Sequence, residues 1–104
     1  MTPTKRSLDH LRAGGWTVEV VEHWNPHARI RQDLFGCVDL IALRGGETLA
    51  VQTTSGDNVA ARVRKIADNP HLPAMRAAGW TVHVHGWRKS ARTRTWELRV
   101  VDVS

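Results

Sequence analysis

Residues 37–55 have the sequence CVDLIALRGGETLAVQTTS, and this stretch decides the fold of the chain. Two segments rich in aliphatic and β-branched residues flank Gly45-Gly46, a pattern typical of a β-hairpin with a two-residue turn. With that turn Arg44 lies opposite Glu47, and the register of the whole hairpin follows. The further pairs that it predicts are Ile41 with Ala50, Asp39 with Gln52, and Cys37 with Thr54.

Polar side chains interrupt this apolar hairpin at one place. The alternation of strand side chains puts Asp39, Gln52 and Thr54 on one face, with the Cβ atoms of Asp39 and Gln52 about 5 Å apart. Two interpretations are open: a structural pair joined by a hydrogen bond, or the floor of a divalent-metal site. The opposite face is expected to carry Val38, Leu40, Leu49 and Val51.

Length and composition limit the class of protein. A chain of 104 residues with 41% hydrophobic residues is expected to form a single domain, residues 1–104, with one core. Its one cysteine, Cys37, excludes an internal disulfide and suits a reducing cytosol. The sequence has neither a long apolar run nor a signal-peptide pattern, so we expect a soluble cytoplasmic protein without a membrane partner. A net charge of +5 favours a polyanionic partner.

The rest of the chain predicts helices and strands around the hairpin. We expect a helix over residues 3–14 and a strand over 16–24, followed by a polar connection over 27–35 without a clear period. After the hairpin we expect a helix capped near Asp57-Asn58 and running to 67, a helical piece over 71–78, a strand over 80–87, a basic loop over 88–94 and a strand over 96–103. The order αβββαβ plus one strand predicts an α+β fold, a mixed sheet flanked by helices.

This order, together with the polar hairpin, resembles the PD-(D/E)XK nuclease superfamily of restriction-endonuclease-like fold, in particular its small Holliday-junction-resolvase-like members. In that family an Asp on the second strand and a Glu-x-Lys on the third hold Mg²⁺ and the attacking water. Here Val38-Asp39 stands in place of the family's Pro-Asp, and Gln52-Thr53-Thr54 in place of Glu-x-Lys. The resemblance implies catalytic roles for Asp39, Gln52 and Thr54, and a Mg²⁺ or Mn²⁺ ion bound by Asp39 and Gln52.

The chain departs from the family pattern at three positions. Thr54 replaces the lysine, and a hydroxyl cannot balance transition-state charge with comparable strength. Gln52 offers a carbonyl ligand without a negative charge. The acid that many resolvase-like members carry on the first helix falls near Thr4.

Other residues are candidates to complete the site. Asp33 or Glu22 would supply a second carboxylate to the metal, and Lys65 would supply the missing catalytic cation. Each also has an ordinary interpretation as a solvated polar residue. His83 and His85 share a strand face and are a weaker metal candidate, because the pattern gives them no acidic or cysteine partner.

Nucleic-acid binding is expected from three groups of basic residues, which the resemblance places around one cleft with Asp39. Trp24 and Trp87, beside polar segments, are candidates for base stacking. The basic residues are Arg29 and Arg31, then Arg62 and Arg64, and finally Arg88, Lys89, Arg92 and Arg94.

The sequence therefore predicts a DNA-binding, nuclease-fold protein that hydrolyses phosphodiesters in branched or double-stranded DNA with Mg²⁺. A catalytically inactive nucleic-acid-binding module on the same fold is the alternative, and a protein-binding accessory factor is a third. The resemblance implies a homodimer, because two sites must act on the two strands of a junction.

Overall fold

We describe the protein from a computed structural model that covers residues 1–104. Three α-helices, one short 3-10 helix and seven strands make up the chain. None of the helices is long and apolar enough to cross a membrane. In order, the elements are α1 (Pro3–Ala13), β1 (Thr17–Val20), β2 (His23–Asn25), β3 (Ile30–Gln32), β4 (Leu40–Arg44), β5 (Glu47–Ser55), η1 (Gly56–Asn58), α2 (Val59–Ala67), α3 (Leu72–Ala77), β6 (Thr81–Lys89) and β7 (Trp96–Asp102).

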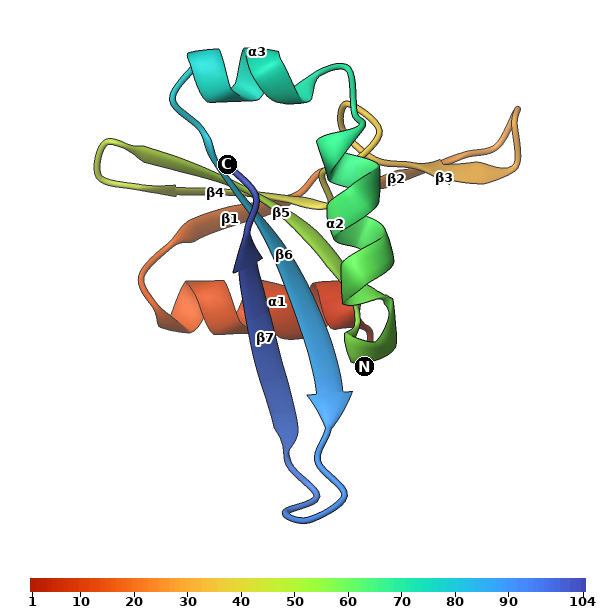
Figure 1. Cartoon of the computed structure of the whole chain (residues 1–104), viewed down its shortest axis with the longest axis vertical. Coiled ribbons are helices and arrows are strands. Elements are labelled where there is room, and N and C mark those ends of the chain that lie inside the picture. The colour runs from red at the N-terminus through yellow and green to blue at the C-terminus, as the bar shows by residue number, and fades with distance from the viewer.

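A five-stranded sheet with the order β1-β4-β5-β6-β7 forms the centre of the molecule (Figure 1). Adjacent strands in this sheet are antiparallel, except for β5 and β6, which are parallel. The crossover that joins β5 to β6 contains α2 and α3. The predicted α+β class, with a mixed sheet flanked by helices and an additional C-terminal strand, is confirmed. Leaving β2, β3 and the short helices η1 and α3 aside, the order α1-β1-β4-β5-α2-β6 is the predicted αβββαβ.

Each face of the sheet has its own core. On one face, Leu8 and Leu11 of α1 pack over buried aliphatic residues of β1, β4 and β5. On the other face, Val59 and Ile66 of α2, with residues of α3, pack over β5 and β6. Because successive residues of β5 alternate between these cores, the end of this strand presents side chains to both faces of the sheet.

Helix α1 begins where its sequence predicts. The hydroxyl of Thr2 accepts the backbone N–H of Lys5 at 3.1 Å, and Pro3 occupies the first turn, where its missing N–H is not needed. The helix ends before Gly15, which has a φ of +86°. This start places Thr4 at the end of α1 that faces β5.

The predicted hairpin register is confirmed from Leu40 to Arg44 and ends there. Leu40 pairs with Val51, yet the N–H of Asp39 also donates to the carbonyl of Val51 at 2.9 Å. Two consecutive residues therefore face one residue of β5, which is the geometry of a β-bulge. The predicted opposition of Asp39 to Gln52 is thus wrong by one residue.

Hydrogen bonds on both sides of Asp39 define the bulge. Its carbonyl accepts the N–H of Val21 at 2.9 Å, in register with β1, whereas Val38 forms a separate bridge with Leu34. The predicted Cys37–Thr54 pair is therefore absent from the ladder. Val38, expected on the face of Leu40, instead belongs with Cys37 to the core beneath α2 and α3.

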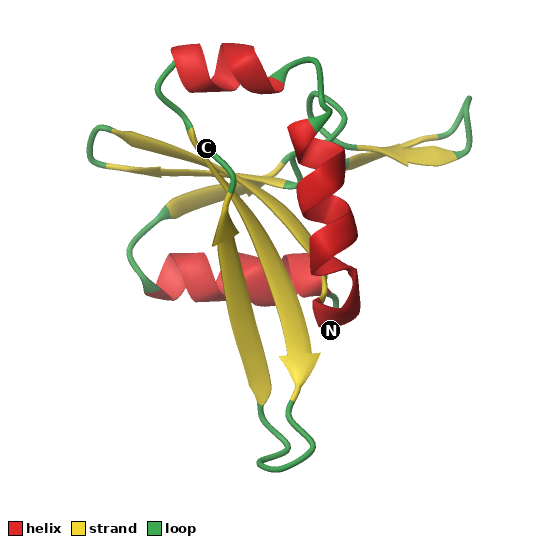
Figure 2. Ribbon diagram, viewed as in Figure 1, coloured by secondary structure: helices red, strands yellow, loops and turns green.

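The predicted strand over residues 16–24 and the irregular connection after it are also wrong in part. The first strand ends at Val20, and residues 23–25 and 30–32 pair as an antiparallel two-stranded ribbon, β2–β3. Figure 2 shows this ribbon extending away from the main sheet. The basic loop expected over 88–94 is shorter, because β6 continues to Lys89.

Candidate metal centre

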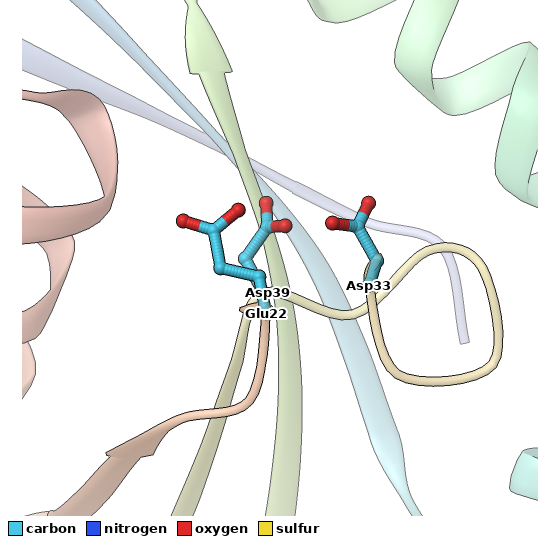
Figure 3. A group of neighbouring side chains, drawn as sticks. All are labelled: Glu22, Asp33 and Asp39. Carbon is cyan, nitrogen blue, oxygen red and sulfur yellow. The ribbon is translucent and has the colours of Figure 1, made fainter. Parts of the chain in front are cut away.

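Three carboxylates meet where the ribbon joins the main sheet. Glu22 follows β1, Asp33 follows β3 and Asp39 precedes β4, and one carboxylate oxygen from each lies within 4.8 Å of the other two. Figure 3 shows all three side chains extending toward the same region, with Asp39 between the other two in this view. Carboxylates gathered so closely repel one another unless protons or a cation are present.

A polar pocket of about 200 Å³ contains this cluster. It opens between the start of α1, the end of β5 and the first turns of α2. Its lining is almost entirely polar, which suits an ion rather than an apolar ligand. The lining residues are Pro3, Thr4, Glu22, Asp33, Asp39, Gln52, Thr53 and Arg62.

Two threonines fix the orientation of the carboxylates. The carboxylate of Asp39 accepts two hydrogen bonds from Thr53, one from the backbone N–H at 2.8 Å and one from the side-chain hydroxyl at 3.2 Å. The hydroxyl of Thr4 donates to Glu22 at 3.2 Å and lies 2.8 Å from the hydroxyl of Thr53. These contacts link α1, β5 and both carboxylates in one network.

Burial and neighbouring charges raise the pKa of Asp39 to about 7. Desolvation is the main cause, since the residue is only 4% exposed, and the negative charges of Asp33 and Glu22 add to it. The hydrogen bond from the Thr53 N–H acts in the opposite direction. Without a cation, the cluster therefore retains a proton to near neutral pH.

Gln52, which lines the pocket, carries an unusual buried acceptor. Its side-chain N–H donates to Asp33 at 3.3 Å, while its carbonyl oxygen Oε1 is buried and has no hydrogen-bond partner. The residue as a whole is 3% exposed. A buried acceptor without a donor costs about 1–3 kcal/mol, and either a hydrogen-bond donor or a cation would satisfy it.

Basic side chains lie beside the three carboxylates. Lys65 of α2 places Nζ 4.0 Å from Asp33, and Arg31 of β3 lies 3.7 Å from Glu22. Arg62, one turn of helix before Lys65, lines the pocket itself. Positive charge therefore borders the acidic cluster from α2 and from the ribbon.

The structure brings together most of the predicted metal-site residues. Asp39, Gln52, Asp33 and Glu22 all line the pocket, so the two alternative carboxylates are both present. Thr54, expected in the position of the family lysine, is buried on β5 and does not line the pocket. Its neighbour Thr53 takes the contact with Asp39, because the bulge re-aims the Asp39 side chain.

The predicted nucleic-acid-binding residues are dispersed. Arg29 lies in the exposed turn of the ribbon, and Arg64 is exposed on α2. The third group lies at the far end of the β6–β7 hairpin, at the bottom of Figure 1, where Arg88 pairs with Glu97 at 3.5 Å. No member of that group, Arg88, Lys89, Arg92 or Arg94, lines the carboxylate pocket.

Sequence reasoning missed the parts played by Thr4 and Thr53. Period-2 alternation places Thr53 on the face opposite Gln52, and the bulge turns the Asp39 side chain toward that face. The sequence marks Thr4 only as the place where the family's acid is absent. A threonine two residues after a helix N-cap carries no distinctive signal, so neither contact was accessible from the sequence.

The two strand histidines belong to a different environment. His85 is buried and its Nδ1 lies 2.9 Å from the hydroxyl of Ser7, which also accepts the indole N–H of Trp87 at 2.8 Å. Desolvation lowers the pKa of His85 to about 4, so the ring is neutral. His83 instead lies 3.8 Å from Asp102. The two histidines therefore do not combine into one ligand set with an acidic group.

Two comparisons with known proteins found no match. The chain matches no protein-family model and none of the curated proteins. The geometry of the pocket therefore carries the functional inference.

Proposed function

We propose that this protein binds Mg²⁺ or Mn²⁺ through Glu22, Asp33, Asp39 and Gln52 and hydrolyses phosphodiester bonds in branched or double-stranded DNA. The unpartnered, buried Oε1 of Gln52 carries this proposal. An amide oxygen accepts hydrogen bonds or ligates cations, and it has no proton to give to an anion. Its place beside three carboxylates favours a cation.

The donor set fits a hard divalent ion. Mg²⁺ and Mn²⁺ prefer carboxylate, carbonyl and water oxygens, and the pocket supplies the first two. A softer metal such as zinc is disfavoured, because the cluster contains neither histidine nor cysteine ligands. When bound, such an ion lowers the pKa of a coordinated water and offsets phosphate charge.

The chain's own residues have separate parts in this proposal. Thr53 and Thr4 hold Asp39 and Glu22 in fixed orientations. Arg62 and Lys65, from successive turns of α2, bind and orient the phosphate at the mouth of the pocket. Lys65 in this way takes the part of the family lysine, which Thr54 cannot.

The order of elements supports the resemblance to resolvase-like nucleases, since the αβββαβ succession is present with Asp39 at the start of the second main strand. The proposal extends to a homodimer, with one site for each strand of a junction, and to the cytoplasm, where Mg²⁺ and DNA are both available. Sedimentation of the purified chain with and without a four-way junction tests the dimer.

A non-catalytic DNA-binding module is the second candidate. The position of Lys65 favours this candidate. The side chain is half-exposed and reaches the cluster from α2, whereas the family lysine lies on the third strand. A lysine held so loosely binds phosphate more readily than it orients an attacking water.

Cleavage assays separate the two candidates. The substrates are a labelled four-way junction and a supercoiled plasmid, each with Mg²⁺, Mn²⁺ or EDTA. We expect metal-dependent cleavage by the native protein and none by Asp39→Asn. Glu47→Gln, which removes an exposed carboxylate at the hairpin turn, is the matched control and should cleave normally. Metal binding without cleavage of either substrate would favour the non-catalytic module, and cleavage by Asp39→Asn would overturn the proposed site.

A further inference from the structure

The β2–β3 ribbon is inserted directly between two of the candidate metal ligands. Glu22 immediately precedes β2, and Asp33 immediately follows β3. The intervening ten residues form the ribbon and its turn, which extend away from the sheet (Figure 1). A change in the position of the ribbon would therefore move two carboxylates of the cluster, Glu22 and Asp33.

The ribbon has little that would stabilise it alone. It has two strands of three residues, and isolated two-stranded hairpins are marginally stable in water. Its two large apolar side chains, Trp24 and Ile30, are 56% and 51% exposed. An exposed tryptophan on a projecting ribbon is accessible to a partner.

The charge of the ribbon defines the chemistry of that partner. Residues 23–32, HWNPHARIRQ, contain two arginines and two histidines and no acidic residue. Trp24 pairs directly with Arg31 across the ribbon, so an aromatic ring and a guanidinium share one face. Arg29, in the exposed turn, adds a second guanidinium at the tip. This combination of an aromatic surface and positive charge suits a polyanion with exposed bases.

A groove of about 650 Å³ joins the ribbon to the acidic cluster. Its lining includes Ile30 and Arg31 of the ribbon, Asp33 of the cluster and Lys65 of α2. Arg31 also lies 3.7 Å from Glu22. A strand of nucleic acid that follows this groove from the ribbon would bring its phosphates to the cluster.

We propose that the β2–β3 ribbon is a nucleic-acid-binding arm that stacks Trp24 on an unpaired base and holds the adjoining phosphate with Arg29. This inference rests on the proposed function for the identity of the substrate. It adds a preference for branched or gapped DNA, because a continuous duplex keeps its base faces stacked and offers none to Trp24. It also couples DNA binding to the metal site, since both ends of the arm are candidate metal ligands.

The coupling has a definite sign. Engagement of the arm restrains Glu22 and Asp33 near Asp39, so DNA tightens metal binding, and by thermodynamic linkage the metal tightens DNA binding by the same factor. The arm itself needs no metal to bind DNA.

Fluorescence anisotropy with EDTA present tests the arm without reference to metal or cleavage. The probes are a labelled four-way junction, a gapped duplex and a continuous duplex of equal length. We expect Trp24→Ala to weaken binding to the junction and the gapped duplex about tenfold, within the range for loss of one base stack, and to change binding to the continuous duplex little. The matched control is Trp96→Ala, which removes a similarly exposed tryptophan from β7.

A second variant tests the tip of the arm. Arg29→Asn retains a residue type that tolerates the left-handed conformation there, φ +56°. We expect it to reduce the slope of log binding constant against log salt by about 0.7–0.9, the contribution of one phosphate contact. Melting curves of each variant verify that the main sheet is folded.

The outcomes separate the arm from the proposed function. Equal junction binding by native protein, Trp24→Ala and Trp96→Ala would overturn the arm, whatever the protein cleaves. Loss of self-association in Trp24→Ala, with unchanged DNA binding, would also overturn it and identify the ribbon as a contact between copies. A selective loss of junction binding in Trp24→Ala supports the arm even if native protein binds no Mn²⁺, a result that would defeat the proposed function alone.

Titration of Mn²⁺ in the presence of an uncleavable phosphorothioate junction tests the coupling. We expect the junction to tighten Mn²⁺ binding to native protein and to leave Mn²⁺ binding to Trp24→Ala unchanged at the same DNA concentration. Equal tightening in both proteins at full DNA occupancy would contradict the coupling through the ribbon.

Discussion

The side-chain amide of Gln52 donates to the carboxylate of Asp33 at 3.3 Å and leaves its own carbonyl oxygen buried without a donor. This hydrogen bond turns the NH₂ group of the amide toward Asp33 and thereby fixes the position of the carbonyl oxygen. A buried acceptor without a donor costs free energy, and in the proposed metal site a bound cation would offset that cost. The Gln52–Asp33 contact therefore connects the fold of the ribbon to the metal site.

Gln52→Met tests the carbonyl ligand. Methionine has a similar length but no oxygen, so we expect the affinity for Mn²⁺ to fall about tenfold or more. The metal-free protein should not lose stability, because the substitution also removes the unpartnered acceptor. Calorimetric titration and urea unfolding in EDTA measure the two effects. Thr54→Val, at the buried neighbouring position outside the pocket, is the control, and equal Mn²⁺ affinity in all three proteins would exclude Gln52 as a ligand.

The raised pKa of Asp39 predicts opposite pH dependences for stability and metal binding. In the metal-free folded protein this pKa is about 7, against an ordinary value of 3.8, so the folded state holds more protons than the unfolded state between these values. The contribution of Asp39 to the free energy of unfolding is therefore greatest below pH 4, falls by at most about 4 kcal/mol as pH rises to 7, and is constant above. Mn²⁺ binds the ionised form, so its affinity should rise up to tenfold per pH unit below pH 7 and then level.

The comparison protein for this pH series is Asp39→Asn. It is required because His85, with a pKa lowered to about 4, makes the opposite contribution, stabilising the fold as pH rises toward 6.5. The stability of native protein minus that of Asp39→Asn should fall between pH 4 and 7. A difference that rises over this interval, or an Mn²⁺ affinity constant from pH 5.5 to 7.5, would contradict the assignment.

Ser7→Ala tests the buried network that joins α1 to β6. The hydroxyl of Ser7 lies between the Nδ1 of His85 and the indole N–H of Trp87, and its removal leaves both groups without this partner. We expect a loss of about 1–3 kcal/mol and a melting temperature lower by several degrees for each kcal/mol. Ser55→Ala, at an exposed position, should change stability by less than about 0.5 kcal/mol. Equal melting temperatures for the two variants would show that the network is not stabilising.

Gly86→Ala tests the contact between α2 and the sheet. A Cβ at Gly86 would overlap the side chain of Val59, the first residue of α2. We expect the substitution to destabilise the protein by about 1–3 kcal/mol, and Val59→Ala to restore part of that loss when the two are combined. Chemical denaturation of the single and double variants measures the coupling. Strictly additive losses would show that the overlap is relieved elsewhere.

The sequence predicts the main hairpin well because a two-residue glycine turn and a period of two together determine the register. It fails at Asp39, where the chain stays in register with β1 but slips by one residue against β5, which is the bulge. No local sequence pattern marks that slip. As a result, Gln52 lines the pocket from the face that the alternation predicts, whereas the Asp39 side chain, expected beside Gln52 and Thr54, turns to Thr53.

The ribbon was missed for a related physical reason. Its strands have three residues each and lack an apolar alternation, so pairing of Trp24 with Arg31 rather than intrinsic propensity defines them. The sequence offers Glu22 and Asp33, eleven residues apart, as alternative sources of a second metal-binding carboxylate. The reversal of the chain in the ribbon brings both to Asp39.

The most direct test of the account is the anomalous scattering of Mn²⁺ in crystals of the native protein. We predict one ordered ion about 2.0–2.4 Å from oxygens of Glu22, Asp33, Asp39 and Gln52, in the range usual for hard divalent cations, and its loss in Asp39→Asn crystals soaked identically. Full Mn²⁺ occupancy at other residues, or an empty pocket at a concentration that saturates the protein in solution, would contradict the metal centre on which the proposed function rests.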